Sequence, residues 1–112
     1  MRNLAKFLIV ISAFYLMSCD TNSLQEIQGV VTNPTYSEHI GPVFNSKCVG
    51  CHSSGNQYPD LQNYSEVQDA VMNGSVICRI ENQCGDIMPP EGALPQQTID
   101  MIVLWQSNGY PN

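Results

Sequence analysis

CVGCH, residues Cys48–His52, is the stretch on which the fold and chemistry of this 112-residue chain depend. Two cysteines separated by two residues can form a redox-active dithiol, supply half of a zinc site, or attach a haem covalently. Only the haem alternative requires the histidine that follows. Each alternative belongs to a different fold, so the rest of the chain must distinguish between them.

The N-terminal segment has the pattern of an export signal. Arg2 and Lys6 precede an apolar run, FLIVISAFYLM, that occupies residues 7–17. A short basic stretch followed by an apolar run of this length is typical of a secretory signal peptide. The run is shorter than the roughly 20 apolar residues that a transmembrane helix needs. We therefore expect residues 1–18 to be a signal peptide.

The apolar run ends in LMSC, and this ending resembles the bacterial lipobox. The resemblance implies cleavage before Cys19 and lipidation of that cysteine, which would anchor the protein to a bacterial membrane facing the periplasm. It does not distinguish the inner membrane from the outer one. The alternative is an ordinary secretory signal with Cys19 unused. Residues 19–35 are mostly polar, so we expect a tether, with an ordered extension of the domain as the alternative.

The charge of the chain after residue 18 bears on its partners. Two basic residues, Lys47 and Arg79, face ten acidic ones, which gives a formal charge of −8. Nucleic acid binding needs a basic face and is therefore excluded. An acidic surface favours a protein partner with a basic docking patch, which electrostatic attraction steers into contact.

The apolar spacing predicts about three helices and an all-α domain over residues 36–112. In the first helix, Ile40, Val43 and Phe44 recur at helical spacing, Ser37 is the expected N-cap, and Pro42 should lie near the start or cause a kink. This helix leads directly into CVGCH.

Two further helices are predicted closer to the C-terminus. One covers residues 64–73 and ends at Gly74, and the last covers residues 95–109, with Pro95 in its first turn and Gly109 at C′. The last helix should be buried on most sides. The segment 75–86 is ambiguous, and the prolines of residues 88–95 exclude regular structure.

The alternatives for CVGCH can now be compared. A dithiol of this kind belongs to a βαβ unit, for which the chain has no predicted strands. A zinc site would need Cys78 and Cys84 as well, but five residues separate them instead of the usual two to four. In the haem alternative, the two thiols add to the vinyl groups of one porphyrin and His52 becomes the proximal ligand.

A methionine offers the second axial ligand that a c-type haem commonly has. Met88 lies in DIMPP, where two prolines stiffen the loop, and it follows His52 by 36 residues. Met72 and Met101 lie at helical, apolar positions, so we expect them in the core. His39, the other histidine, is expected to be exposed.

With these motifs, residues 36–112 resemble a small monohaem class I cytochrome c domain. The resemblance covers an N-terminal helix, CVGCH, a middle helix, the Met88-Pro89-Pro90 loop and a C-terminal helix with a tryptophan. It implies a small cytochrome c-like fold around one covalent haem c, with thioethers at Cys48 and Cys51 and axial ligands His52 and Met88. It also implies that Phe44 and Trp105 mark the contact of the terminal helices.

Cys78 and Cys84 depart from the simplest members of that family. Neither precedes a histidine, which excludes a second covalent haem. Since an exported protein meets oxidising conditions, we expect a disulfide between them, worth roughly 2 kcal/mol in the chain-entropy model, with free thiols or an unusual redox role as the alternatives. Three polar residues after the haem motif could donate hydrogen bonds to haem propionates: Tyr58, Asn63 and Tyr64.

The resemblance implies an electron carrier rather than an enzyme, acting with redox protein partners either as a monomer or as a subunit of a respiratory complex. The alternative is a haem-based gas-binding or sensing domain, which would follow if Met88 left the distal site open or labile. A peroxidase is less compatible, because the bacterial peroxidases comparable to this chain carry two C-x-x-C-H motifs.

Overall fold

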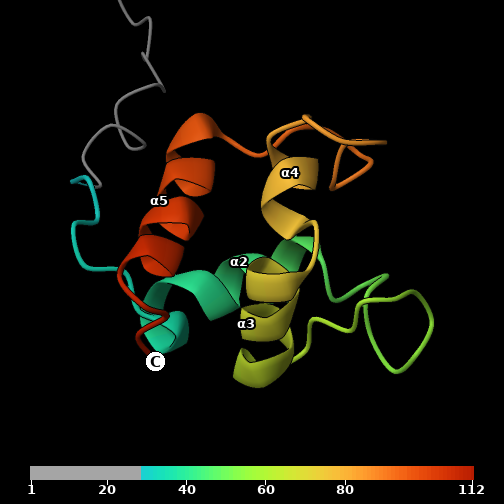
Figure 1. The fold of residues 1–112 in the computed structure, drawn as a ribbon, viewed down its shortest axis with the longest axis horizontal. Coiled ribbons are helices and arrows are strands. Elements are labelled where there is room, and N and C mark those ends of the chain that lie inside the picture. The colour runs from blue at the N-terminus through green and yellow to red at the C-terminus, as the bar shows by residue number, and fades with distance from the viewer. Residues whose placement is uncertain (1–28) are drawn as a thin grey trace, which may run out of the picture.

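The structure, a computed structural model, describes residues 29–112, which contain four α-helices and one π-helical turn but no strand (Figure 1). The prediction of an all-α domain is confirmed for these residues. The predicted signal peptide, the lipidation site Cys19 and most of the tether lie outside them. Within residues 29–112, no helix has both the length and the apolar character needed to cross a membrane.

The first helical segment changes its winding at a proline. The turn η1 (Tyr36–Ile40) runs directly into α2 (Gly41–Lys47). The N–H groups of Ile40 and Gly41 bond to carbonyls five residues back, which is the wider π-type pattern. Pro42 explains the widening, because its ring has no N–H to donate and would clash with the carbonyl four residues earlier.

This wider turn also moves the start of the helix. The predicted N-cap, Ser37, is wrong: the N-cap is Thr35, which makes no side-chain capping bond. Gly41 is needed where the segment tightens again. A Cβ at that position would lie 3.0 Å from the carbonyl oxygen of Tyr36 and 3.2 Å from its ring.

The middle helix, α3 (Tyr64–Asn73), matches the prediction at both ends and stops at Gly74. Its N-cap is Asn63, whose side-chain oxygen accepts a hydrogen bond from the Glu66 N–H at 3.1 Å. A side chain that satisfies a free amide in the first turn favours this starting point.

Two helices follow α3. The segment that the sequence left ambiguous contains α4 (Val76–Ile80). Residues 81–95 are irregular, and they include the stretch 88–95 for which the prolines predicted this. The last helix, α5 (Gln96–Ser107), begins after Pro95, so Pro95 is the N-cap and not a first-turn residue. Gly109 lies at C′ with a φ of +80°, a conformation that suits glycine.

The core forms where the two ends of the described chain meet. Helix α5 packs against η1, and α4 contacts both α3 and α5 (Figure 1). Trp105 is fully buried, and its ring is surrounded by those of three tyrosines: Tyr36, Tyr64 and Tyr110. Pro34, in the predicted tether, is also fully buried.

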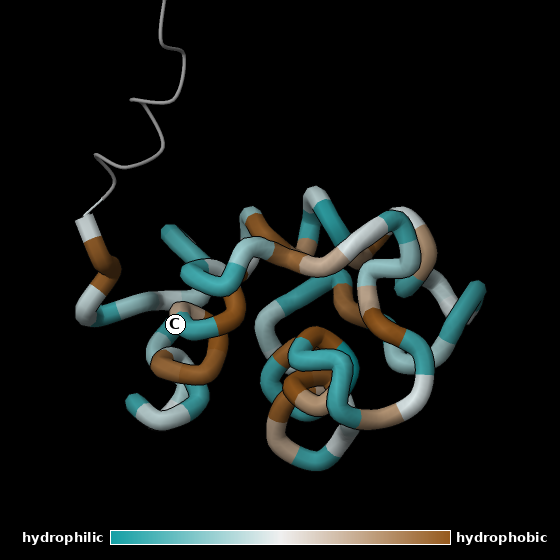
Figure 2. Tube along the Cα trace, turned by 90° about the horizontal axis from the view of Figure 1, so that it is seen from above, coloured by the Kyte–Doolittle hydropathy of each residue, from teal (hydrophilic) through white to brown (hydrophobic). Residues whose placement is uncertain are grey.

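Hydrophobic and hydrophilic residues are interspersed along the helices (Figure 2), and the buried ones among them form this core. Ile99 and Ile102 are buried on α5, and Val67 and Val71 are buried on α3. The expectation that Met72 belongs to the core is wrong, because 51% of its surface is exposed.

Candidate functional site

A cavity of about 630 Å³ lies between the helices and is lined by all four residues predicted to hold the haem, Cys48, Cys51, His52 and Met88. Each wall comes from a different part of the chain. The apolar part of the lining includes residues from α2, α3, α4, α5 and the connecting loops: Phe44, Leu61, Ala70, Val76, Ile80, Leu94 and Ile102. The volume lies within the range of about 300–1,000 Å³ that is usual for cofactor sites.

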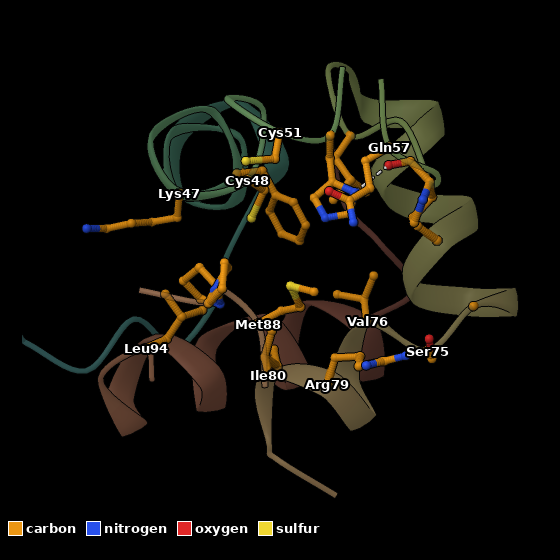
Figure 3. A pocket seen from close by; sticks show the side chains of 18 of the residues that line it. Lys47, Cys48, Cys51, Gln57, Ser75, Val76, Arg79, Ile80, Met88 and Leu94 are labelled. Atoms are coloured by element: carbon orange, nitrogen blue, oxygen red, sulfur yellow. Dashed lines mark hydrogen bonds between the residues drawn. The ribbon is translucent and has the colours of Figure 1, made fainter. Parts of the chain in front are cut away.

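The CVGCH stretch folds as a single turn that continues from α2. The N–H groups of Cys51 and His52 bond to the carbonyl oxygen of Cys48 at 3.1 and 2.9 Å. Residues three or four apart on such a turn lie on the same side, so both thiols and the imidazole can face one ligand. Figure 3 shows Cys48 and Cys51 next to each other on one wall.

The two thiols differ in their surroundings. Cys51 is exposed, whereas Cys48 is half-buried. Burial raises the pKa of the Cys48 thiol to about 11, because removal from water disfavours the thiolate. The buried thiol is therefore the weaker nucleophile in the folded chain.

The imidazole of His52 is oriented by the loop that follows it. Its Nδ1 lies 2.9 Å from the carbonyl oxygen of Pro59. A carbonyl only accepts hydrogen bonds, so Nδ1 carries the proton and Nε2 keeps a free lone pair. A second bond, from the Leu61 N–H to the His52 carbonyl at 2.9 Å, ties the same loop to the turn. Nε2 is thereby prepared as a metal ligand.

Met88 lies on the wall opposite Cys48 and Cys51, with its thioether directed into the cavity (Figure 3). It belongs to the irregular segment 81–95, and the buried Pro89 follows it. The N–H of Met88 donates to the carbonyl oxygen of Arg79 at 3.3 Å. The cavity is thus faced by a nitrogen ligand and a sulfur ligand from separate segments.

This set of donors fits a haem. Imidazole nitrogen and thioether sulfur are a known axial pair for haem iron, and two thiols on one turn suit the two vinyl groups. Among residues 29–112, no three His, Cys, Asp or Glu side chains gather to form a metal site by themselves. A porphyrin, which supplies four further ligands to its iron, needs only the two axial ones from the protein.

The competing chemistries gain no support from the arrangement. The sulfurs of Cys78 and Cys84 lie at bonding distance, as the expected disulfide requires, with Cα atoms 5.5 Å apart. These two cysteines therefore do not join Cys48 and Cys51 as zinc ligands. The part of the chain that is described has no strand, and hence no βαβ unit for a redox dithiol.

Two of the three predicted propionate donors are engaged elsewhere. The Asn63 side chain caps α3, and the Tyr64 hydroxyl donates to the carbonyl oxygen of Tyr110 at 2.7 Å. Tyr58 does line the cavity, with 89% of its surface exposed. His39 is half-buried instead of exposed, and its Nδ1 accepts from the Thr35 N–H at 3.3 Å, outside the cavity lining.

Sequence reasoning missed several residues of the lining. Lys47 and Arg79 both border the cavity, and they are the only lysine and arginine of residues 29–112. Lysine and arginine are rare in this acidic chain, and that rarity could have marked Lys47 and Arg79 as candidates for the site. Gln57 and Ser75 also line the cavity, and nothing in the sequence pattern marks them.

Comparison with known proteins adds no relative to this picture. No protein-family model, no curated protein and no solved structure matches this chain. The interpretation of the site therefore rests on its own residues and their geometry.

Proposed function

We propose that the domain is a one-electron carrier, a c-type cytochrome with one covalent haem held by Cys48 and Cys51 and ligated by His52 and Met88. The observation that carries this proposal is the convergence of these four side chains on a single cavity. An imidazole and a thioether that are 36 residues apart in sequence face the same space, and two thiols lie beside them.

The residues of the chain have distinct roles in this proposal. A bound haem would supply the one-electron chemistry of iron, and the protein would control its surroundings. The hydrogen bond to the Pro59 carbonyl holds His52 in the tautomer that leaves Nε2 free. Met88 would supply a soft thioether ligand, which favours reduced iron. The apolar lining, including Phe44 and Leu61, would limit the access of water to the bound group.

The proposed partners are redox proteins with a basic patch. Three carboxylates at the cavity are exposed, those of Asp69, Asp86 and Glu91, and could meet such a patch near the haem. The lipid at Cys19 would hold the carrier at a bacterial membrane facing the periplasm. Within this proposal, the domain acts as a monomer or as a subunit of a respiratory complex.

The second candidate is a gas-binding or sensing domain, and the attachment of Met88 is the feature that favours it. The bond from its N–H to Arg79 is 3.3 Å long, slightly beyond the usual range. A thioether on a loop whose own main-chain bond is this long could leave the iron when carbon monoxide or nitric oxide arrives, unless other contacts hold the loop.

The test is to mature the full chain in a periplasm that attaches haem and to record its spectra. We expect a pyridine haemochrome spectrum for one covalent c-type haem and, in the oxidised protein, the weak red absorption band of methionine-ligated ferric haem. Met88→Ala should keep the haem and lose the band. The matched control is Met72→Ala, because Met72 is exposed and lies outside the cavity lining.

Three outcomes separate the candidates. Failure to attach haem would reject both haem proposals. Persistence of the band in Met88→Ala would exclude Met88 as the ligand. Rapid binding of carbon monoxide by the unmodified ferrous protein would favour the sensor over the carrier, since a carrier keeps its sixth ligand.

A further inference from the structure

Two hydrogen bonds from one residue hold the segment that carries Met88. The carbonyl oxygen of Arg79, on α4, accepts from the Met88 N–H at 3.3 Å. The guanidinium Nη1 of the same residue donates to the carbonyl oxygen of Asp86 at 3.0 Å. Arg79 thus bonds to the irregular segment at two positions: its main-chain carbonyl accepts from Met88, and its side chain donates to Asp86.

Gly85 leaves space for the guanidinium group of Arg79. Gly85 has a φ of +58°, a conformation that favours glycine. A Cβ built on it would collide with the guanidinium of Arg79. The arginine therefore lies against the main chain at position 85, and any larger residue there would push it aside.

The Cys78–Cys84 pair links the chain next to Arg79 to the chain next to Gly85. Cys78 directly precedes Arg79, and Cys84 directly precedes Gly85. Within the loop, the Gln83 N–H bonds to the Cys78 carbonyl at 2.8 Å, and the Asn82 N–H bonds to the Arg79 carbonyl at 3.2 Å. The bridge fixes the distance between the end that holds the arginine and the end that holds the glycine.

The charge of Arg79 alone does not account for this arrangement. Although eight carboxylates belong to residues 29–112, the side-chain hydrogen bond of the guanidinium goes to a main-chain carbonyl. A side chain that only balanced charge would have no need of a fixed carbonyl partner or of a glycine beneath it. The contacts are those of a structural brace directed at residues 86–88.

We propose that Arg79, seated on Gly85 and framed by the Cys78–Cys84 bridge, is a positioning residue that keeps the Met88 thioether at the iron. This inference rests on the proposed function, because it concerns the ligand that Met88 would provide. The brace sets how readily an external ligand displaces the thioether. A thioether that stays on the iron makes the domain an electron carrier, whereas one that is easily displaced makes it a sensor.

The test compares how easily imidazole displaces methionine in the haem-loaded ferric protein. In Arg79→Gln and Gly85→Ala, we expect imidazole to bind about tenfold more tightly than in the parent, which corresponds to about 1.4 kcal/mol. The methionine band should weaken in the same variants. Arg79→Lys, which keeps the charge and a donor, should retain more of the band than Arg79→Gln. The double variant Cys78→Ser/Cys84→Ser should shift in the same direction as Gly85→Ala.

Lys47→Gln is the matched control. It removes the other cation at the cavity, whose side chain extends away from the wall that carries Met88 (Figure 3). The proposal predicts unchanged imidazole affinity in this variant. An equal shift in Lys47→Gln and Arg79→Gln would show a charge effect and overturn the brace.

Other outcomes distinguish failure of the Arg79 proposal from failure of the proposed function. If the parent shows the methionine band and Arg79→Gln and Gly85→Ala both bind imidazole within twofold of the parent, the brace is wrong and the proposed function stands. If the parent lacks the band, the ligand assignment itself is wrong and the brace falls with it. Gly85→Ala leaves the arginine in the chain, so unchanged imidazole affinity in that variant overturns the brace even if Arg79→Gln fails to fold.

Discussion

At the scale of single residues, the orientation of side chains is what the sequence leaves open. CVGCH predicts which histidine is the ligand, but the hydrogen bond that selects its tautomer comes from Pro59, seven residues away in a loop without periodicity. Arg79 is similar, since its partners at Asp86 and Met88 follow from the path of an irregular segment. Such contacts depend on loop geometry, which neither spacing nor composition specifies.

Trp105 allows a residue-scale prediction. Its Nε1 donates to the carbonyl oxygen of Pro111 at 2.8 Å, and its ring is fully buried. Trp105→Phe should lower the free energy of unfolding of the haem-loaded protein by about 1–2 kcal/mol, through the lost hydrogen bond and the smaller ring. The Pro111 oxygen still accepts from the Tyr36 N–H, which keeps the loss modest.

Denaturant titration measures this loss. The control is Ser37→Ala, which removes an exposed hydroxyl away from the cavity lining and should change stability by less than about 0.5 kcal/mol. Equal stability of Trp105→Phe and the parent would show that the anchoring of the C-terminus to α5 contributes little.

At the scale of elements, prediction succeeded where one apolar stripe and one terminating glycine acted together. Helix α3 shows both features and has the predicted bounds. The start of η1 was misplaced because Pro42 acts backwards on the preceding turn, an effect that apolar spacing does not contain. Asn63 was a candidate for either a cofactor contact or a helix start, because a polar residue before a helix has the same appearance in both roles; the structure shows the cap.

The cap of α3 gives the element-scale prediction. Asn63 accepts from the Glu66 N–H, and the Glu66 carboxylate accepts from the Gln62 N–H at 2.7 Å. Asn63→Ala should cost about 1 kcal/mol, and Asn63→Asp should retain most of the stability. For a domain of this size, the expected fall in melting temperature is about 4–8 °C.

Asn73→Ala, at the opposite end of α3, is the control for this experiment. Its amide bonds to an exposed carboxylate, that of Asp69, and its loss should cost less than about 0.5 kcal/mol. If Asn63→Ala had the same melting temperature as Asn73→Ala and the parent, the cap would make no measurable contribution to stability.

At the scale of the whole molecule, the helical class and the cavity differ in how far the sequence predicts them. The predicted all-α class is confirmed for residues 29–112, because helical periodicity is a local signal. The cavity is not local: its lining is drawn from four helices and the three segments that connect them. The sequence could predict the two motifs that chemistry requires, CVGCH and Met88, but not the polar residues that the fold places beside them.

If the cavity holds the proposed haem, a chain without it should lose its structure. The haem would supply the apolar contacts of the cavity lining, and a domain this small has little other core to replace them. We expect the variant Cys48→Ala/Cys51→Ala, prepared without haem, to show little helical circular dichroism. A cooperative thermal transition in that variant would contradict this expectation.

The half-buried position of Cys48 has a consequence for the order of biogenesis. In the folded domain its thiol is shielded, and burial raises its pKa to about 11, so very little thiolate exists near neutral pH. Attachment to a vinyl group would then be slow at this position and faster at the exposed Cys51. Under the proposed function, the chain should be most reactive toward a porphyrin before it folds. Closure of the helices would follow attachment, and a chain that folded too early would mature poorly.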